Sequence, residues 1–399
     1  MAVIRIDEPR VKPKTPPKGF ALFALGFRPF FFVGALLAAL WLPLWIALLS
    51  GALTFSPVFP GMLWHGHEML FGFAAAIISG FLLTAVKNWT GLATPKGKPL
   101  AALVVLWLLG RVAMLGDMPV VAAVLDISFL PVVGVVLARI LIRANSRRNY
   151  FVPLLLLALA LANGLTHAGA HGWLEVSPLL GLHLAVALIT VLETVIAGRI
   201  VPGFTANALR TVPWRNTAVD RLAIASTAVA FLLWAINAAP LVTGVVAALA
   251  FSGQAIRVWG WRPLATARTP LLWILHVSHG WILFALLVLA LAGLGLCEST
   301  PVLHLLTVGA TGGLIIGMIT RTALGHTGRL LQSGVLETSC YVLLQCAVIL
   351  RVLPLFGLVT NVYLPLLWGA ALVWSACFTL YLWKFVPILM RPRPDGNPG

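Results

Sequence analysis

Histidine is the residue type in this sequence best suited to bind a transition metal or a heme iron. A neutral imidazole is a ligand of copper, iron and heme, whereas calcium and magnesium prefer oxygen. His167 and His171 are four residues apart and share a helical face with Asn163, and His276 and His279 are three residues apart. Each pair would lie on one face of a helix and could bind one metal ion. The nine histidines are His65, His67, His167, His171, His183, His276, His279, His304 and His326.

The cysteines offer no competing metal site. The sequence contains four cysteines and neither a Cys-x-x-Cys nor a Cys-x-x-Cys-His motif. This argues against a zinc ribbon, a thioredoxin-like site and covalent attachment of heme. Any heme would therefore be bound noncovalently, and the thiols are expected to be buried structural groups.

The composition predicts that these histidines lie in a membrane protein. Hydrophobic residues make up 60% and charged residues 10% of the 399 residues, and the mean hydropathy is +1.01. A soluble domain carries about 25% charged residues, so this chain cannot cover a water-facing surface. The composition excludes a soluble enzyme, a disordered chain and a disulfide scaffold, and it predicts an all-α integral membrane protein.

Long apolar runs predict about twelve transmembrane helices. A helix needs about 20 apolar residues to cross a hydrocarbon core of about 30 Å. The third and eighth predicted helices are the shortest of the set. The predicted spans are 28–50, 62–86, 100–116, 119–142, 150–171, 178–200, 218–239, 241–257, 270–294, 301–322, 334–353 and 362–387.

The basic residues predict the orientation of these spans. All but two of the 27 Lys and Arg residues fall in the tails or in the connections of one side, and the exceptions are Arg111 and Arg351. Cytoplasmic loops are enriched in Lys and Arg, so both termini are expected in the cytoplasm. The net charge of +16 lies in short clusters between apolar runs. This distribution indicates contact with membrane lipids and argues against nucleic acid.

A single membrane domain between two tails is the expected organisation. Residues 1–20 carry basic residues among prolines and lack the usual apolar core of a signal peptide, so they predict a flexible cytoplasmic tail. Residues 21–390 are expected to form the transmembrane helical domain, and residues 391–399 a second cytoplasmic tail. The outer connections, such as 51–61 and 172–177, are short, so the chemistry is expected within the bilayer.

The predicted topology brings most histidines to one depth near the outer side. His276 and His279 fall nearer the middle of the ninth span, and His326 falls on the cytoplasmic side. Ionisable groups within spans are costly and usually functional. Several imidazoles at one depth favour a metal or heme site over separate hydrogen bonds to nearby carbonyls. The histidines near the outer side are His65, His67, His167, His171, His183 and His304.

Acidic residues and a threonine within the spans suggest a polar path. Glu193 and Thr320 fall in the inner halves of the sixth and tenth spans, and carboxylates within spans often carry protons. The alternative for Glu193 is an ion pair with Arg199, six residues further along the chain. Glu68 and Asp126 are further acidic residues within the spans, and Glu68 is a candidate for the same path.

Five segments form an ordered set of motifs over most of the chain. They are GFRPFF (Gly26–Phe31), WHGHEMLFGF (Trp64–Phe73), SGFLLTAVKNWTG (Ser79–Gly91), GRIVPGFTANAL (Gly198–Leu209) and HLLTVGATGGLIIGMITRTALGHTGR (His304–Arg329). This set resembles the NnrS family of bacterial membrane proteins, with a departure at Lys87, where proline is expected. The resemblance implies a heme- and copper-containing inner-membrane protein linked to nitric oxide metabolism, denitrification and nitrosative stress. It does not imply a defined reaction.

A fainter similarity concerns heme–copper oxidase subunit I. The motif His65-Gly66-x-x-Met69-x-Phe71 looks like the helix-2 segment of that subunit, in which the histidine is an axial ligand of a low-spin heme. His304 also has a counterpart there. The His-Pro-Glu-Val-Tyr segment that supplies copper ligands in the oxidases is absent from the sixth span, so oxidase-like turnover is not implied.

From these resemblances, a b-type heme is predicted between His65 and His304, with His67 as the main alternative ligand. On a helix with 3.6 residues per turn, His65 and His67 point about 200° apart, so they cannot bind the same iron. Glu68 is the expected partner of His67.

Copper is assigned to His167 and His171 on one helical face and, across a short outer loop, to His183 as well. Three nitrogen ligands suit copper. The rival copper pair is His276 and His279.

The main functional hypothesis is therefore a heme- and copper-binding membrane protein whose partner is nitric oxide or a related small molecule. Its electron donor and reaction are not specified by the sequence. The alternatives are a solute or proton-coupled transporter that uses the intramembrane histidines, and a structural or assembly protein.

Overall fold

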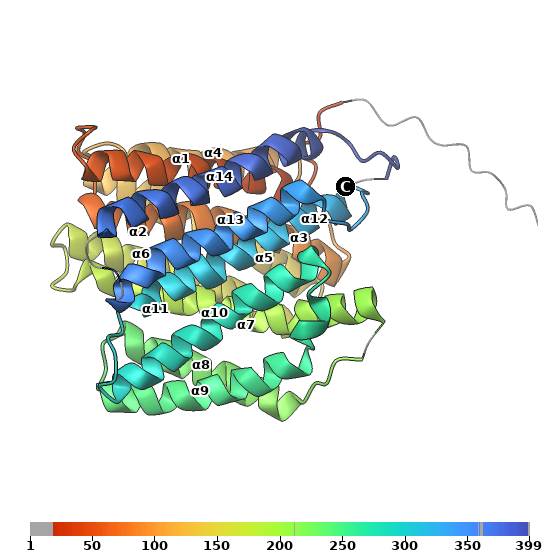
Figure 1. Cartoon of the computed structure of the whole chain (residues 1–399). Coiled ribbons are helices and arrows are strands. Elements are labelled where there is room, and N and C mark those ends of the chain that lie inside the picture. The colour runs from red at the N-terminus through yellow and green to blue at the C-terminus, as the bar shows by residue number, and fades with distance from the viewer. Residues whose placement is uncertain (1–18, 211, 358, 360–361, 398–399) are drawn as a thin grey trace, which may run out of the picture.

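The computed structural model describes residues 19–210, 212–357, 359 and 362–397, and this part is helical without a strand. The helices run side by side as one bundle (Figure 1). The α-helices are α1 (Phe27–Leu49), α2 (Gly61–His67), α3 (Ala75–Thr90), α4 (Lys98–Ala113), α5 (Pro119–Arg143), α6 (Phe151–Ala170), α7 (Pro178–Leu209), α8 (Thr217–Ala235), α9 (Pro240–Gly260), α10 (Pro270–Gly293), α11 (Pro301–His304), α12 (Gly313–His326), α13 (Val335–Val352) and α14 (Tyr363–Met390).

Two π-helical and three 3₁₀ segments complete the set. The π-helices join their neighbours into continuous rods, because η1 connects α2 to α3 and η4 connects α11 to α12. The described part therefore contains twelve rods, as the apolar runs predicted. The short segments are the π-helices η1 (Glu68–Ala74) and η4 (Leu305–Gly312) and the 3₁₀ helices η2 (Arg147–Asn149), η3 (Pro263–Thr266) and η5 (Leu353–Phe356).

Eleven of these rods are long and apolar enough to cross a membrane. The remaining rod is α4, which has 16 residues and corresponds to the third predicted span. The protein is thus an all-α, multi-pass membrane protein. Helices suit this environment because they satisfy all their backbone hydrogen bonds internally.

Proline and glycine mark several helix ends. Helices α5, α7, α9, α10 and α11 each begin with proline, a residue whose missing N–H costs nothing at the first helical position. Helix α3 ends at Thr90 and is capped by Gly91, whose φ of 71° is the left-handed conformation common at helix C-termini.

The largest difference from the predicted spans is at α7, which was expected over 178–200 and continues to Leu209. The extension is held by tertiary contacts. Thr205 Oγ1 lies 3.0 Å from His276 Nε2 of α10, and the helix ends where Arg210 adopts a φ of 51°.

Burial identifies the interior rods. In the most apolar window, 89% of the residues of the α2–η1–α3 rod and 72% of those of the α11–η4–α12 rod are buried, against 39% for α1. Helices α8 and α9 pack on each other and lie along one edge of the bundle (Figure 1). The two interior rods carry four of the histidines of interest, His65, His67, His304 and His326.

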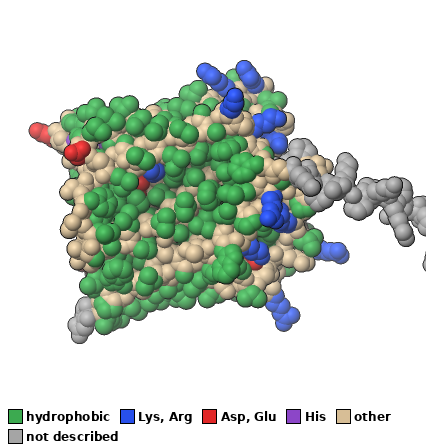
Figure 2. All heavy atoms as spheres, turned by 90° about the horizontal axis from the view of Figure 1, so that it is seen from above, with side chains coloured by type: hydrophobic (Ala, Val, Ile, Leu, Met, Phe, Trp, Pro, Cys, Tyr) green, Lys and Arg blue, Asp and Glu red, His purple; other side chains and the backbone are tan. Residues whose placement is uncertain are grey.

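Lys and Arg side chains gather at one end of the bundle (Figure 2). We call this the basic end, and the other the opposite end. The basic end holds the connections that the sequence assigned to the cytoplasm, such as 91–97 and 327–334. Residues 1–18 of the predicted N-terminal tail and residues 398–399 of the C-terminal tail lie outside the described residues.

Candidate functional site

The histidines predicted near the outer side form two groups at the opposite end. His65 and His67 are separated because residues two apart on a helix point in nearly opposite directions. We call the first group the polar cluster and the second the histidine cavity. The polar cluster consists of His67, Glu68, Arg111, Asp126, Asn163 and His167, and the histidine cavity is lined by His65, His183, His304 and Arg351, among other residues.

Four rods assemble the polar cluster. Asn163 and His167 project from one face of α6, one helical turn apart. Gly110 of α4 lets that helix approach α5 closely, because a Cβ at Gly110 would lie 3.2 Å from the Asp126 Cα. This approach brings the neighbouring Arg111 to the Asp126 carboxylate.

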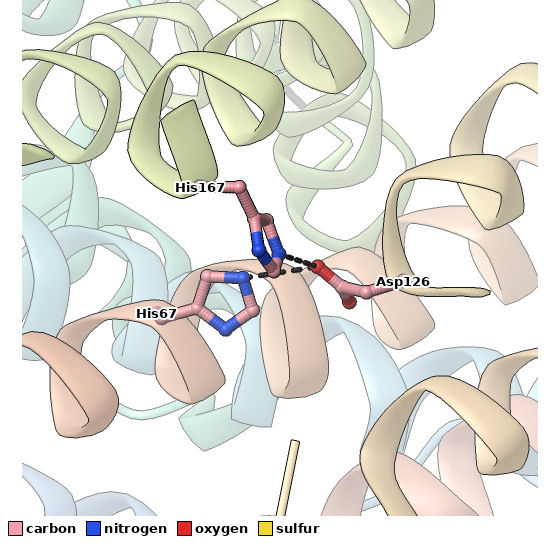
Figure 3. A group of neighbouring side chains, drawn as sticks. All are labelled: His67, Asp126 and His167. Carbon is pink, nitrogen blue, oxygen red and sulfur yellow. Dashed lines mark hydrogen bonds and ion pairs between the residues drawn. The ribbon is translucent and has the colours of Figure 1, made fainter. Parts of the chain in front are cut away.

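The cluster is a connected hydrogen-bond network around His67 and Asp126 (Figure 3). Asp126 Oδ2 lies 3.0 Å from His67 Nε2 and 3.1 Å from His167 Nε2. Asn163 Nδ2 donates to Asp126 Oδ2 at 2.6 Å, and Asn163 Oδ1 lies 2.9 Å from His67 Nε2. The other ring nitrogen, His67 Nδ1, lies 3.0 Å from Glu68 Oε1, which is the contact expected from the sequence.

The polar cluster carries one net negative charge if both of its imidazoles are neutral. Arg111 forms ion pairs with both Glu68 and Asp126, and all three side chains are buried. Two carboxylates facing one guanidinium leave one negative charge. Both ring nitrogens of His67 face acceptor oxygens, whereas a neutral imidazole has a single N–H. A bound cation or a protonated imidazole would satisfy both the charge and the hydrogen bonds.

The same atoms could hold a metal ion. The ligand atoms of His67, Asp126 and His167 all lie within 4.8 Å of one another. Two imidazole nitrogens and one carboxylate oxygen suit copper, iron or zinc better than calcium. Glu68 and Asn163 would orient the ligands, because metal-binding histidines usually use their second ring nitrogen in a further hydrogen bond.

His171 lies beside the polar cluster, and His183 does not. The His171 and His167 rings are 6.0 Å apart, and both pack against Phe59. His183 lines the histidine cavity and packs on Trp234. His183 is therefore separated from His167 and His171, the other members of the predicted copper set. The reason is helical geometry, because Gly181 faces α6 and His183, two residues later, points the other way.

The histidine cavity has a volume of about 300 Å³ and a mostly apolar lining. His65 comes from α2 and His304 from the end of α11. The His65 ring stacks on Trp45 with ring centres 4.1 Å apart and an interplanar angle of 19°. The Nδ1 atoms of both histidines are buried without a hydrogen-bond partner in the described part. The lining also includes Met62 and Leu179. Because both side chains are exposed, the cavity reaches the surface beside them.

This lining fits a heme. An apolar slot between helices that carries one or two imidazoles is the usual environment of a b-type heme. Buried ring nitrogens without protein partners are costly, and a ligand that uses the imidazoles removes that cost. His67, the alternative heme ligand, is turned into the polar cluster.

The rival copper pair lies elsewhere, in the half of α10 nearer the basic end. His276 Nε2 is paired with Thr205, and His279 Nε2 lies 3.4 Å from Gln254 Oε1. Both rings also pack against Trp261. The Nδ1 atoms of both are buried without a hydrogen-bond partner among the described residues, whereas the Nε2 contacts match those of hydrogen-bonded histidines in a polar core.

Glu193 and Thr320 are not joined into one path by the interactions in the described part. The polar neighbour of the Glu193 carboxyl is Thr311, which lines the histidine cavity. Glu193 Oε2 is buried without a partner, and the alternative partner Arg199 donates to Asn149 Oδ1 at 2.8 Å. Thr320 pairs with a tyrosine hydroxyl at 2.6 Å.

Two arginines, Arg111 and Arg351, belong to the two sites. Arg111 and Arg351 were singled out only as exceptions to the charge distribution. Arg111 completes the polar cluster, and Arg351 lines the histidine cavity. A basic residue within the membrane-embedded region is costly unless a site uses its charge. The departure of these two arginines from the charge distribution therefore indicated a site. Asp126 and Asn163 had been noted only as polar residues.

A comparison with protein families gives a match over nearly the whole chain. The family model described as NnrS protein matches residues 21–393, a range that contains both the polar cluster and the histidine cavity. No curated protein matches the sequence.

Proposed function

Because the chain belongs to the NnrS family, we propose that it is a heme- and copper-binding protein of the bacterial inner membrane that acts in nitric oxide metabolism or the nitrosative-stress response. The family supports the nitric oxide-related role. The observation that carries the cofactor proposal is that two imidazoles, His65 and His304, line one apolar cavity, each with a buried Nδ1 that has no hydrogen-bond partner among the described residues.

His65 and His304 would hold the heme. A bound heme iron supplies a site for nitric oxide and for one-electron chemistry. The protein contributes an apolar lining that excludes water and the Trp45 ring that orients His65. Thr311 brings the Glu193 carboxyl next to this cavity.

His67, His167 and Asp126 would hold the copper, in place of the set His167, His171 and His183. A bound copper ion supplies a second one-electron centre. Arg111 holds the carboxylates in position. In the predicted orientation, both sites lie toward the periplasmic side of the membrane.

The test is an absorbance spectrum combined with metal analysis. Protein is purified in detergent from cells supplied with heme and copper, and a deletion strain carrying the gene is challenged with a nitric oxide donor. We expect a Soret band, about one copper per chain and restored growth. A colourless, copper-free protein would contradict the proposal, and solute uptake by such protein in proteoliposomes would support the transporter alternative.

A further inference from the structure

The histidine cavity contains one permanent charge. Arg351 lies in the last turn of α13 and lines the cavity four residues after Ala347, which lines it as well. The other polar side chains of the lining are the three histidines, Thr307 and Thr311. No Asp or Glu belongs to the lining, and no carboxylate of the described residues forms an ion pair with Arg351.

Arg351 also stands apart from the other basic residues. The basic clusters of the sequence lie at the basic end, whereas α13 starts there and Arg351 lies near its far terminus. The rule that basic residues mark cytoplasmic loops therefore does not explain the position of Arg351. Its neighbour Tyr363 begins α14 and is 43% exposed, so the guanidinium lies close to the surface at the opposite end.

Arg351 is half-buried, and its polar neighbour Tyr363 offers a hydroxyl group and not a carboxylate. An anionic partner inside the cavity would stabilise the guanidinium, because charges are costly in apolar surroundings unless they are paired. Arginine binds carboxylates well because its planar guanidinium can donate two parallel hydrogen bonds. The cavity thus combines an apolar lining, three imidazoles and one carboxylate-binding group. Its complement is a planar apolar molecule with carboxylates at one edge.

We propose that Arg351 binds a propionate carboxylate of the heme and thereby orients the porphyrin, with its carboxylates at the end of α13 near Tyr363. This inference rests on the proposed function, because it assigns a residue to the same cavity. Arg351 acts as a positioning residue, which predicts that the carboxylates of the porphyrin contribute to affinity and that this contribution depends on Arg351.

Porphyrin binding tests the inference without an activity assay. Heme-depleted protein in detergent is titrated with hemin and with hemin dimethyl ester, whose propionates carry no charge, and the Soret band is followed. Hydrogen bonds to charged groups are strong enough for us to expect hemin to bind about tenfold or more tightly than the diester. Arg351→Met should remove this preference by weakening hemin alone, and Arg351→Lys should retain part of it. The matched control is Arg139→Met at an exposed site on α5.

The outcomes separate the two proposals. Equal binding of both porphyrins to the wild-type protein, or an unchanged preference in Arg351→Met, overturns the inference and leaves the heme proposal standing. Failure of both porphyrins to bind saturably overturns the proposed function, and the inference with it. If Arg351→Met does not fold, the wild-type preference and the Arg351→Lys variant still decide.

Discussion

Arg111 is the residue on which the polar cluster depends electrostatically. Its side chain pairs with Glu68 and Asp126, and all three groups are buried. Removing one partner from a buried ion pair leaves an uncompensated charge, which typically costs about 3–5 kcal/mol. Arg111→Met should therefore lower the melting temperature in detergent strongly.

The control for this variant is Arg139→Met on α5, where the side chain is exposed and little change is expected. Adding Glu68→Gln to Arg111→Met should restore part of the lost stability, because it removes one of the stranded carboxylates. Equal melting temperatures for Arg111→Met and Arg139→Met would show that the pairs contribute nothing.

The heme assignment makes a prediction for His65 and His304. His65→Ala and His304→Ala should each remove or shift the Soret band at an unchanged protein level, because each deletes an imidazole from the cavity lining. His326→Ala at the basic end should leave the spectrum unchanged. Normal heme content and spectra in both cavity variants would defeat the assignment.

The copper assignment makes a separate prediction for the polar cluster. His67→Ala, His167→Ala and Asp126→Asn should each lower bound copper, measured by elemental analysis, to about a tenth or less of the wild-type level. Substitution of a group that only orients ligands weakens metal binding by about 10–100-fold, so loss of a direct ligand should cost at least as much. The control is the double variant His276→Ala and His279→Ala, and copper loss in this control alone would favour the rival pair.

At this scale, the sequence identified the chemically important residue types and part of their grouping, since His65 and His304 line one cavity and His167 lies beside His171. His65, His67 and His304 could be placed at one depth from the spans, and the opposite directions of His65 and His67 followed from helical geometry. The partnership of His67 with Asp126 and Asn163 joins residues far apart in the chain. Such contacts depend on which helices are neighbours, and periodicity carries no information about that.

Among the elements, the two π-helices are directly linked to the sites. η1 begins at Glu68, directly after His67, and η4 begins at Leu305, directly after His304. π-helical turns are rare and often occur at functional sites. They were not predicted, because the switch from i→i+4 to i→i+5 hydrogen bonds leaves no distinct pattern of apolar residues. The rods that contain them were predicted well, since their apolar runs are long.

The packing of α6 on α7 depends on Gly181. A Cβ at this position would lie 2.7 Å from the Thr166 backbone nitrogen and would also meet the Ala162 carbonyl oxygen. Gly181→Ala should destabilise the protein by about 1–3 kcal/mol, the usual cost of overpacking, and lower its melting temperature.

Gly203→Ala is the matched control, because it lies on the same helix with no atom near the added Cβ. Since α6 carries His167 and α7 carries His183, the Gly181→Ala variant should also bind less copper and heme. A melting temperature equal to that of Gly203→Ala would show that α6 and α7 can move apart without cost.

For the whole molecule, hydropathy and charge predicted the twelve rods because the bilayer constrains both strongly. A span must be long and apolar, so even the short helix α4 could be located. The sequence separated His65 and His304 from His167, as the structure does, but it did not place His183 in the cavity, because that depends on the rotation of each rod about its axis. The continuation of α7 to Leu209 was missed for a related reason: tertiary contacts such as the pair of Thr205 and His276 hold it.

The orientation of the molecule in the membrane is the last prediction. Twelve rods return the chain to the side on which it starts, and the Lys and Arg clusters gather at that end (Figure 2). Because basic loops remain in the cytoplasm, the basic end should be cytoplasmic and both sites should lie toward the periplasm.

Green fluorescent protein, which folds in the cytoplasm, should fluoresce when fused after Gly97 or Gly399. Alkaline phosphatase, which is active only in the periplasm, should be active when fused after Gly172, in the connection between α6 and α7. Phosphatase activity after both Gly97 and Gly399 would reverse the orientation and place the histidine sites on the cytoplasmic side, whereas phosphatase activity after Gly399 alone would contradict the even number of spans.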